Sequence, residues 1–259
     1  MKTAKHKTSL KVCLLAAVAL AFFAFQQANE ITVYLIGDST MADKEVKAYP
    51  ETGWGMPFRY FFDQTVTVDN RAKNGRSTRT FIEEGRWQPV VENLKEGDYV
   101  LIQFGHNDEV QTKKSYTTQD QFKANLARFV TESRSKNAIP VLITPVARRK
   151  FDAQGKIEET HAVYTQLVKD VAKQLNVPLI DLDKESQELV QQFGPDASKY
   201  LYNHLEPGEN PHYPEGRADN THFSELGARK MAEIVLHDIQ KLNLELAEHI
   251  RVVHQKEKK

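Results

Sequence analysis

Short apolar runs alternate along this sequence with segments of helical periodicity, and this alternation restricts the possible folds more than any other feature. We predict a strand at each apolar run, namely Ile31–Ile36, Val66–Asp69, Tyr99–Phe104, Pro140–Thr144 and Pro178–Leu182. Short strands that are apolar almost throughout are typical of a sheet covered on both faces. The predicted fold class is therefore α/β, a three-layer α/β/α sandwich with a central parallel sheet.

Helical patterns fill the stretches between these runs. We predict helices at Pro57–Phe62, Thr80–Leu94, Thr118–Lys136, Ala162–Leu175, Lys184–Phe193 and from Glu225 to about His249. Thr118 and Gln121 have the spacing of a capping box, which predicts a helix start at Thr118. Because helices separate the strands, the carboxyl ends of the strands meet at one edge of the sheet, where ligands collect in this class of fold.

The stretch from Gly194 to Gly216 interrupts the alternation. It is rich in Pro, Gly, Asn and His, and it contains Tyr200, Tyr202 and Tyr213. We predict a long loop here. Two interpretations are open, because a loop of this length can form a wall of a substrate cleft or be a surface insertion.

The beginning of the chain has the pattern of a secretory signal. Several lysines precede an apolar run from Val12 to Phe25, and glutamines follow it. The run is shorter than the roughly 20 residues that span a bilayer, so we expect no stable membrane anchor. We predict a signal peptide at residues 1–28, one domain at residues 29–259, and a secreted or periplasmic location. The only cysteine, Cys13, lies inside the run, so the mature chain would lack disulfides and thiol catalysis.

Composition excludes some classes of partner. The 259 residues include 35 Lys and Arg and 35 Asp and Glu, so there is no overall basic field and we expect no nucleic-acid partner. The length suits one substantial domain, and we expect a monomer. We expect the basic run Arg148–Lys150, after the fourth predicted strand, to be solvated charge.

A hydroxyl group stands at the end of the first predicted strand, where Val33–Ile36 leads into Gly37, Asp38 and Ser39. Serine is a weak nucleophile at neutral pH, so catalysis by Ser39 requires a base and donors for an oxyanion. The alternative is a turn serine that caps the following segment. Ser77 is a competing hydroxyl, but its surroundings lack the second glycine of a Gly-x-Ser-x-Gly elbow. We expect Asp38 to hold its turn through backbone N–H groups.

The required base and donors are present elsewhere in the sequence. Asp219 precedes His222 by three residues, a spacing that lets a carboxylate orient an imidazole. Gly75 and Asn107 each follow an apolar stretch and can offer a backbone N–H and a side-chain amide to an oxyanion. We therefore predict that Ser39, Asp219 and His222 are catalytic, and that Ser39, Gly75 and Asn107 form the oxyanion hole.

Taken together, these segments resemble the SGNH or GDSL hydrolase family. Its four blocks occur here in the family's order, as Gly37-Asp38-Ser39, Gly75, Gly105-His106-Asn107-Asp108 and Asp219-Asn220-Thr221-His222. The resemblance runs from about Ile31 to the helix after Ser224. It is similar above all to the rhamnogalacturonan acetylesterase branch, through Gly53-Trp54-Gly55, Asn74-Gly75-Arg76-Ser77, Gly105-His106-Asn107-Asp108 and Asp219-Asn220-Thr221-His222-Phe223.

The resemblance implies an SGNH or flavodoxin-like sandwich and a secreted serine esterase. The expected reaction removes acetyl groups from an acetylated plant cell-wall polysaccharide or oligosaccharide, rhamnogalacturonan of pectin in particular. It would proceed through an acyl-serine intermediate and need no cofactor. Two alternatives remain: an SGNH lysophospholipase or thioesterase with a long apolar channel, and a non-catalytic carbohydrate-binding relative.

Four further residues are expected to bind substrate, namely Trp54, Arg76, His106 and His212. Core packing of Trp54 and solvated charge at Arg76 are the alternative interpretations. A metal site built from Asp219, His222 and His212 is less favoured, because no helix carries a His-Glu-x-x-His pattern and the base role already explains the Asp-His spacing. We therefore expect no metal ion.

Overall fold

The computed structural model describes residues 30–251, and the signal-peptide prediction lies outside this range. The strands of the main sheet are β1 (Ile31–Gly37), β2 (Val66–Asn70), β3 (Tyr99–Gln103), β4 (Ile139–Ile143) and β5 (Leu179–Ile180). They pair in the order β2-β1-β3-β4-β5, and every pairing is parallel. All the predicted strands are present in this sheet.

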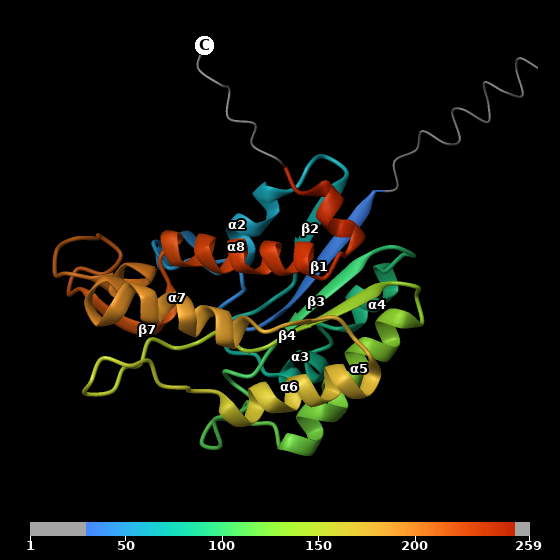
Figure 1. Ribbon diagram of the computed structural model, residues 1–259, viewed down its shortest axis with the longest axis horizontal. Helices are drawn as coiled ribbons and strands as arrows, with labels where there is room; N and C mark the ends of the chain where they lie inside the picture. The colour runs from blue at the N-terminus through green and yellow to red at the C-terminus, as the bar shows by residue number, and fades with distance from the viewer. Residues whose placement is uncertain (1–29, 252–259) are drawn as a thin grey trace, which may run out of the picture. The chain divides into compact units, whose positions relative to one another are not determined.

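Helices cover both faces of the sheet (Figure 1). One face carries α2 (Gly55–Phe58), α7 (Leu182–Ala197) and α8 (Glu225–Lys241). The other face carries α3 (Thr78–Glu83), α4 (Gln88–Asn93), α5 (Gln119–Arg134) and α6 (Ala162–Leu175). Alternate residues of a strand point to opposite faces, so Val33 packs in the first core and Tyr34 in the second. The predicted three-layer α/β/α sandwich is confirmed.

A second, two-stranded sheet occupies part of the region predicted as a long loop. After α7 the chain forms the 3-10 helix η3 (Ser198–Leu201) and β6 (Tyr202–Leu205), which pairs antiparallel with β7 (Arg217–Phe223). The prediction of a loop across Gly194–Gly216 is wrong, because only the second half of this stretch, residues 206–216, is irregular. Asp219 and His222 consequently lie on a strand.

Two predicted helices are interrupted. The predicted helix Thr80–Leu94 is two helices, α3 and α4, and Gly85 between them has a φ of 68°, a left-handed conformation that suits glycine. The last helix ends at Lys241, and the separate 3-10 helix η4 (Glu245–His249) follows it. The predicted start of α5 is confirmed, because Thr118 and Gln121 form the capping box. The other 3-10 helices are η1 (Val46–Ala48) and η2 (Arg59–Phe61).

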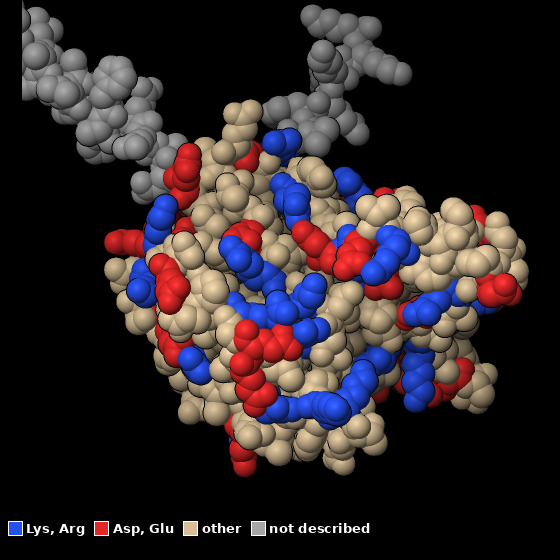
Figure 2. All heavy atoms as spheres, turned by 180° about the vertical axis from the view of Figure 1, so that it is seen from behind, with Lys and Arg blue, Asp and Glu red and all other residues tan. Residues whose placement is uncertain are grey.

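Neither positive nor negative charge dominates the face of the molecule seen in Figure 2. Basic and acidic side chains alternate there over short distances. Such a pattern gives no broad field for a polyanion, in line with the balanced composition. Within residues 30–251, no helix combines the length and the hydropathy that a membrane span requires.

Candidate active site

Ser39 lies in the turn directly after β1. The turn is held by Asp38, whose Oδ1 accepts hydrogen bonds from the main-chain N–H and the hydroxyl of Thr40, both at 2.9 Å. Burial raises the pKa of Asp38, and the hydrogen bonds from Thr40 oppose this rise. The structure confirms that Asp38 acts on its own turn, as the sequence predicted. Ser39 itself is partly exposed.

A chain of hydrogen bonds joins Ser39 to two residues of β7. Nε2 of His222 lies 2.9 Å from Oγ of Ser39, although the two residues are 183 positions apart. Nδ1 of the same imidazole lies 2.9 Å from Oδ2 of Asp219. In this arrangement the carboxylate fixes the tautomer of the imidazole, and Nε2 faces the hydroxyl as an acceptor. The three residues predicted to be catalytic are therefore adjacent and in the order that proton transfer requires.

Asp219 is held as a carboxylate by its surroundings. Its Oδ1 accepts the main-chain N–H groups of Thr221 at 2.8 Å and His222 at 3.0 Å. Arg217 donates to Oδ2 at 2.8 Å. Burial alone would raise the pKa of Asp219, but the hydrogen bonds from His222 and Thr221 outweigh burial and hold it well below its usual range. Asp219 therefore stays ionised in mildly acidic solution, and a loss of activity there would arise from another group.

The residues predicted for the oxyanion hole lie on loops that meet at the same edge. Lys73 donates its N–H to the carbonyl of Gly37 at 3.0 Å, which joins the Gly75 loop to the end of β1. Gly75 is exposed and has a φ of 77°, a conformation that favours glycine. The Nδ2 of Asn107 donates to the carbonyl of Arg76 at 3.1 Å, which orients the amide and leaves its second N–H for another acceptor.

Asp108 secures the Asn107 loop from behind. Its Oδ1 accepts the main-chain N–H of Thr78 at 2.9 Å and the hydroxyl of the same residue at 2.6 Å. Burial raises the pKa of Asp108 to about 7. These bonds tie the loop after β3 to the first turn of α3. Ser77, the competing hydroxyl, caps that helix by accepting the N–H of Thr80, so its side chain is structural.

Lys44 is a buried residue of the site that the sequence did not indicate. Its Nζ donates to the carbonyl of Ser39 at 2.6 Å and to Oδ1 of Asn74 at 2.9 Å, and it lies 2.8 Å from Oε1 of Glu51. Only 2% of the Lys44 side chain is exposed. One ammonium group thus links the turn of Ser39 to the Gly75 loop. A lysine with this role has no local signature, because its partners are distant in sequence.

Arg148 and Arg149 attach β7 to the rest of the site, so the expectation of solvated charge at Arg148–Lys150 is wrong for these two residues. Arg148 donates to the hydroxyl of Thr221 at 3.0 Å and to Glu109 at 3.3 Å. Arg149 donates from its main-chain N–H and from its guanidinium to Asn220, at 2.8 Å and 3.0 Å. The two arginines therefore hold the two residues that precede His222, Thr221 and Asn220.

Two of the residues expected to bind substrate are buried. Trp54 has no exposed surface, and its indole N–H donates to the side chain of Gln103 inside the core. His106 is 3% exposed and packs against the ring of His161, with 4.2 Å between the ring centroids. Burial lowers the pKa of His106 well below its usual value. The expectation that Trp54 and His106 contact substrate is therefore wrong, because Trp54 has no exposed surface and His106 has almost none.

The other two residues expected to bind substrate remain accessible. Arg76 is partly exposed, but its guanidinium already lies 3.0 Å from the carboxylate of Glu84. Its clearest contribution is the main-chain carbonyl that accepts the amide of Asn107. His212 is exposed between β6 and β7, and its main-chain N–H donates to Asn210. Substrate contacts by Arg76 and His212 stay predictions.

Potential metal ligands gather at one place within residues 30–251. Glu185 of α7 and His237 and Asp238 of α8 have ligand atoms within 4.8 Å of one another. Nζ of Lys241 lies 2.9 Å from both carboxylates. The ammonium group of Lys241 therefore already occupies both carboxylates and balances one of their two negative charges. The three residues considered for a metal site in the sequence, Asp219, His222 and His212, are not part of it.

An imidazole between a serine and a carboxylate, at the carboxyl edge of a parallel sheet, is the arrangement of the serine hydrolases. The comparison with known families identifies a family of acylhydrolases. The model of the GDSL-like lipase/acylhydrolase family matches residues 35–230. The chain belongs to this family.

Two bacterial relatives narrow the assignment. Rhamnogalacturonan acetylesterase RhgT of Bacillus subtilis is 45% identical over 221 residues, which cover 85% of this chain and 94% of that protein. The probable rhamnogalacturonan acetylesterase YesY of the same species is 35% identical over 227 residues, covering 84% of this chain and 96% of the relative. The predicted family and branch are confirmed, and the chain is a carboxylic ester hydrolase.

Solved structures share the fold. The crystal structure of protein YxiM from Bacillus subtilis superposes with a TM-score of 0.72 at 25% identity, and the match covers 83% of this chain and 58% of YxiM. The acetylxylan esterase Axe2 of Geobacillus stearothermophilus gives a TM-score of 0.57 at 19% identity, with 81% of this chain and 94% of Axe2 covered. The likeness to Axe2 concerns the fold alone.

Proposed function

We propose that the chain is a secreted esterase that removes acetyl groups from rhamnogalacturonan by a Ser-His-Asp mechanism. The observation that carries the mechanism is the pair of 2.9 Å contacts from His222, one to Ser39 and one to Asp219. The lysine-rich start and apolar run of residues 1–28 support export as a signal peptide. The remaining residues, 29–259, form the catalytic domain in this proposal.

The reaction begins when Oγ of Ser39 attacks the acetyl carbonyl while Nε2 of His222 takes the hydroxyl proton. The carbonyl oxygen becomes an oxyanion, which accepts hydrogen bonds from the N–H groups of Ser39 and Gly75 and from the amide of Asn107. The C–O bond to the sugar breaks, and the imidazolium returns the proton to the sugar oxygen. A water molecule then gives a proton to His222 and attacks the acetyl carbon of the acetyl-serine. The bond from that carbon to Oγ breaks, Oγ takes the proton back from the imidazolium, and acetate leaves.

The substrate class comes from the relatives. RhgT is named a rhamnogalacturonan acetylesterase and YesY a probable one, and each covers more than four fifths of this chain. An acetyl group offers little surface for recognition, so selectivity must come from contacts with the surrounding sugar. This requirement favours a carbohydrate surface beside Ser39 over a long apolar channel.

The test is the release of acetate from acetylated rhamnogalacturonan and from p-nitrophenyl acetate. The purified enzyme should hydrolyse both, and Ser39→Ala should lower kcat by about 10⁴-fold or more while the protein stays folded. Ser77→Ala is the matched control, because Ser77 lies in the neighbouring block and caps α3. It should keep kcat close to that of the wild type.

Three outcomes would contradict the proposal. Substantial turnover by Ser39→Ala would remove Ser39 as the nucleophile. A preference of the wild type for long acyl chains over acetate would favour a lysophospholipase or thioesterase. Binding of the polysaccharide without any release of acetate would favour a carbohydrate-binding protein without catalysis.

A further inference from the structure

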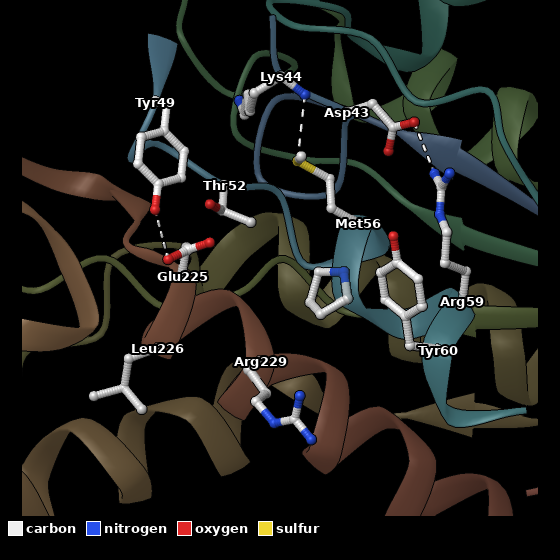
Figure 3. A pocket seen from close by; sticks show the side chains of 11 residues that line it. Asp43, Lys44, Tyr49, Thr52, Met56, Arg59, Tyr60, Glu225, Leu226 and Arg229 are labelled. Carbon is white, nitrogen blue, oxygen red and sulfur yellow. Dashed lines mark hydrogen bonds and ion pairs between the residues drawn. The ribbon is translucent and has the colours of Figure 1, made fainter. Parts of the chain in front are cut away.

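A cavity of about 610 Å³ lies beside the candidate active site, between the segment after β1 and the start of α8 (Figure 3). Lys44, Tyr49 and Tyr60 line it from the first segment, and Leu226 and Arg229 line it from α8. Neither Ser39 nor His222 lines it. The catalytic steps described above therefore leave this cavity without a role.

Large side chains at this cavity are unusually exposed. Tyr60 is 73% exposed, Tyr49 is 47% exposed and Leu226 is 44% exposed. The hydroxyl of Tyr49 donates to Oε2 of Glu225 at 2.8 Å, which holds its ring beside the opening (Figure 3). Exposed apolar surface gathered around a cavity is typical of a binding site. Tyrosine rings suit sugars, because the ring packs on the apolar face of a pyranose while polar groups nearby meet its hydroxyls.

The cavity is connected to the nucleophile through two short links. Lys44, which lines it, donates to the carbonyl of Ser39 at 2.6 Å. Thr52, which also lines it, donates its main-chain N–H to the carbonyl of Phe223 at 2.9 Å, and Phe223 follows His222. The wall of the cavity is therefore one hydrogen bond away from Ser39 and one hydrogen bond away from the residue after His222.

The lining offers one cation, Arg229, to an acidic sugar. The other two cations, Lys44 and Arg59, already pair with Glu51 and Asp43, each at 2.8 Å. Arg229 uses its Nε in a contact of 3.3 Å with Glu233, which leaves other N–H groups of the guanidinium for a ligand. A guanidinium can bind a carboxylate through two parallel hydrogen bonds. Galacturonate, the acidic unit of rhamnogalacturonan, carries such a carboxylate.

We propose that this cavity is a subsite that binds the rhamnogalacturonan chain beyond the acetylated sugar, with Tyr60 packing on a sugar ring and Arg229 binding a galacturonate carboxylate. The proposal rests on the proposed function. Only the polymer can bind at this subsite, since p-nitrophenyl acetate has no sugar units. The subsite therefore lowers KM for the polysaccharide and leaves turnover of the small ester unchanged.

The experiment compares kinetics on acetylated rhamnogalacturonan and on p-nitrophenyl acetate. Tyr60→Ala should raise KM for the polysaccharide by about tenfold, the upper range for one aromatic contact, and leave kcat/KM for p-nitrophenyl acetate within about twofold. Arg229→Gln should raise KM for the polysaccharide and leave kcat/KM for p-nitrophenyl acetate, which has no carboxylate, within about twofold. Leu242→Ala is the control, because Leu242 is a large exposed side chain just after α8, is 36% exposed and does not line this cavity.

The outcomes separate the two proposals. If the wild type releases no acetate from either ester, the proposed function fails before the subsite is tested. If the wild type is active and Tyr60→Ala has the same KM for the polysaccharide as Leu242→Ala, the subsite is refuted. An equal loss on both substrates would also refute it. An unchanged KM for Arg229→Gln would overturn the assignment of an acidic sugar.

Discussion

Lys44 connects the two loops whose N–H groups are assigned to the oxyanion. Its ammonium lies between the Ser39 carbonyl, Asn74 and Glu51, and it is almost completely buried. Buried lysines are costly unless they are paired, so each partner here offsets the loss of hydration. Removing the ammonium would free the Gly75 loop relative to Ser39. A misplacement of about 1 Å can cost about 10²-fold in rate.

We therefore expect Lys44→Met to lower kcat on p-nitrophenyl acetate by about tenfold to hundredfold, with KM changed by less than about twofold. The variant also leaves Glu51 unpaired, which lowers stability. The double variant Lys44→Met with Glu51→Gln removes this unpaired charge and should regain stability without regaining kcat. Measuring kcat and thermal unfolding on both proteins separates the effects. A double variant with the kcat of the wild type would show that Lys44 only stabilises the fold.

At the level of single residues, the sequence indicated the roles that depend on local spacing. Asp219 and His222 are three positions apart, and Ser39 directly follows a strand, so short patterns were sufficient. Lys44 and Arg148 could not be found in this way, because they act on partners up to 73 positions away. The predictions of substrate contact by Trp54 and His106 failed for a different reason. Tryptophan and histidine occur both in cores and at binding sites, so the sequence alone does not show whether their rings are buried.

Helix α8 begins immediately after the segment that carries His222, and its packing limits how that segment can move. Gly227, in its first turn, lies against the backbone of η3. A Cβ at this position would be 1.7 Å from the carbonyl oxygen of Leu201, which is backbone and cannot rotate away. Alanine is intrinsically a better helix former than glycine by about 1 kcal/mol, but this gain is smaller than the cost of such an overlap.

Gly227→Ala should therefore lower the free energy of unfolding by about 1–3 kcal/mol, or more if the helix has to shift. Chemical denaturation monitored by circular dichroism measures the change. The matched control is Gln240→Ala, an exposed position of the same helix, which should change stability by less than about 0.5 kcal/mol. Equal stability of Gly227→Ala and the wild type would contradict the described contact between α8 and η3.

The elements themselves were predicted with uneven success. The strands of the main sheet were found because each is a short apolar run, whereas β6 and β7 were missed. Those two contain polar residues such as Asn203, His204 and Asn220, so neither alternation nor an apolar run marks them. The sequence predicts one helix across Gly85, because a single residue in the left-handed conformation hardly changes the spacing of the apolar residues around it.

At the scale of the whole molecule, the site lies where the chain changes direction across the sheet. From β1 the chain passes to β2 on one side, and then to β3 on the other side of β1. The loops after these neighbouring strands carry Ser39, Gly75 and Asn107. Ligands in open α/β sheets bind at such a switch point. The sequence predicted that these loops share an edge, but the order of the strands required the structure.

The central claim is that Ser39 is a nucleophile activated by His222. A serine-directed fluorophosphonate tests it directly, because such a reagent reacts only with an activated hydroxyl. Peptide mapping by mass spectrometry after inactivation should find one label per chain, on Ser39, and His222→Ala should abolish the labelling. A label on Ser77, or on Ser39 to the same extent without the imidazole, would contradict this account of the enzyme.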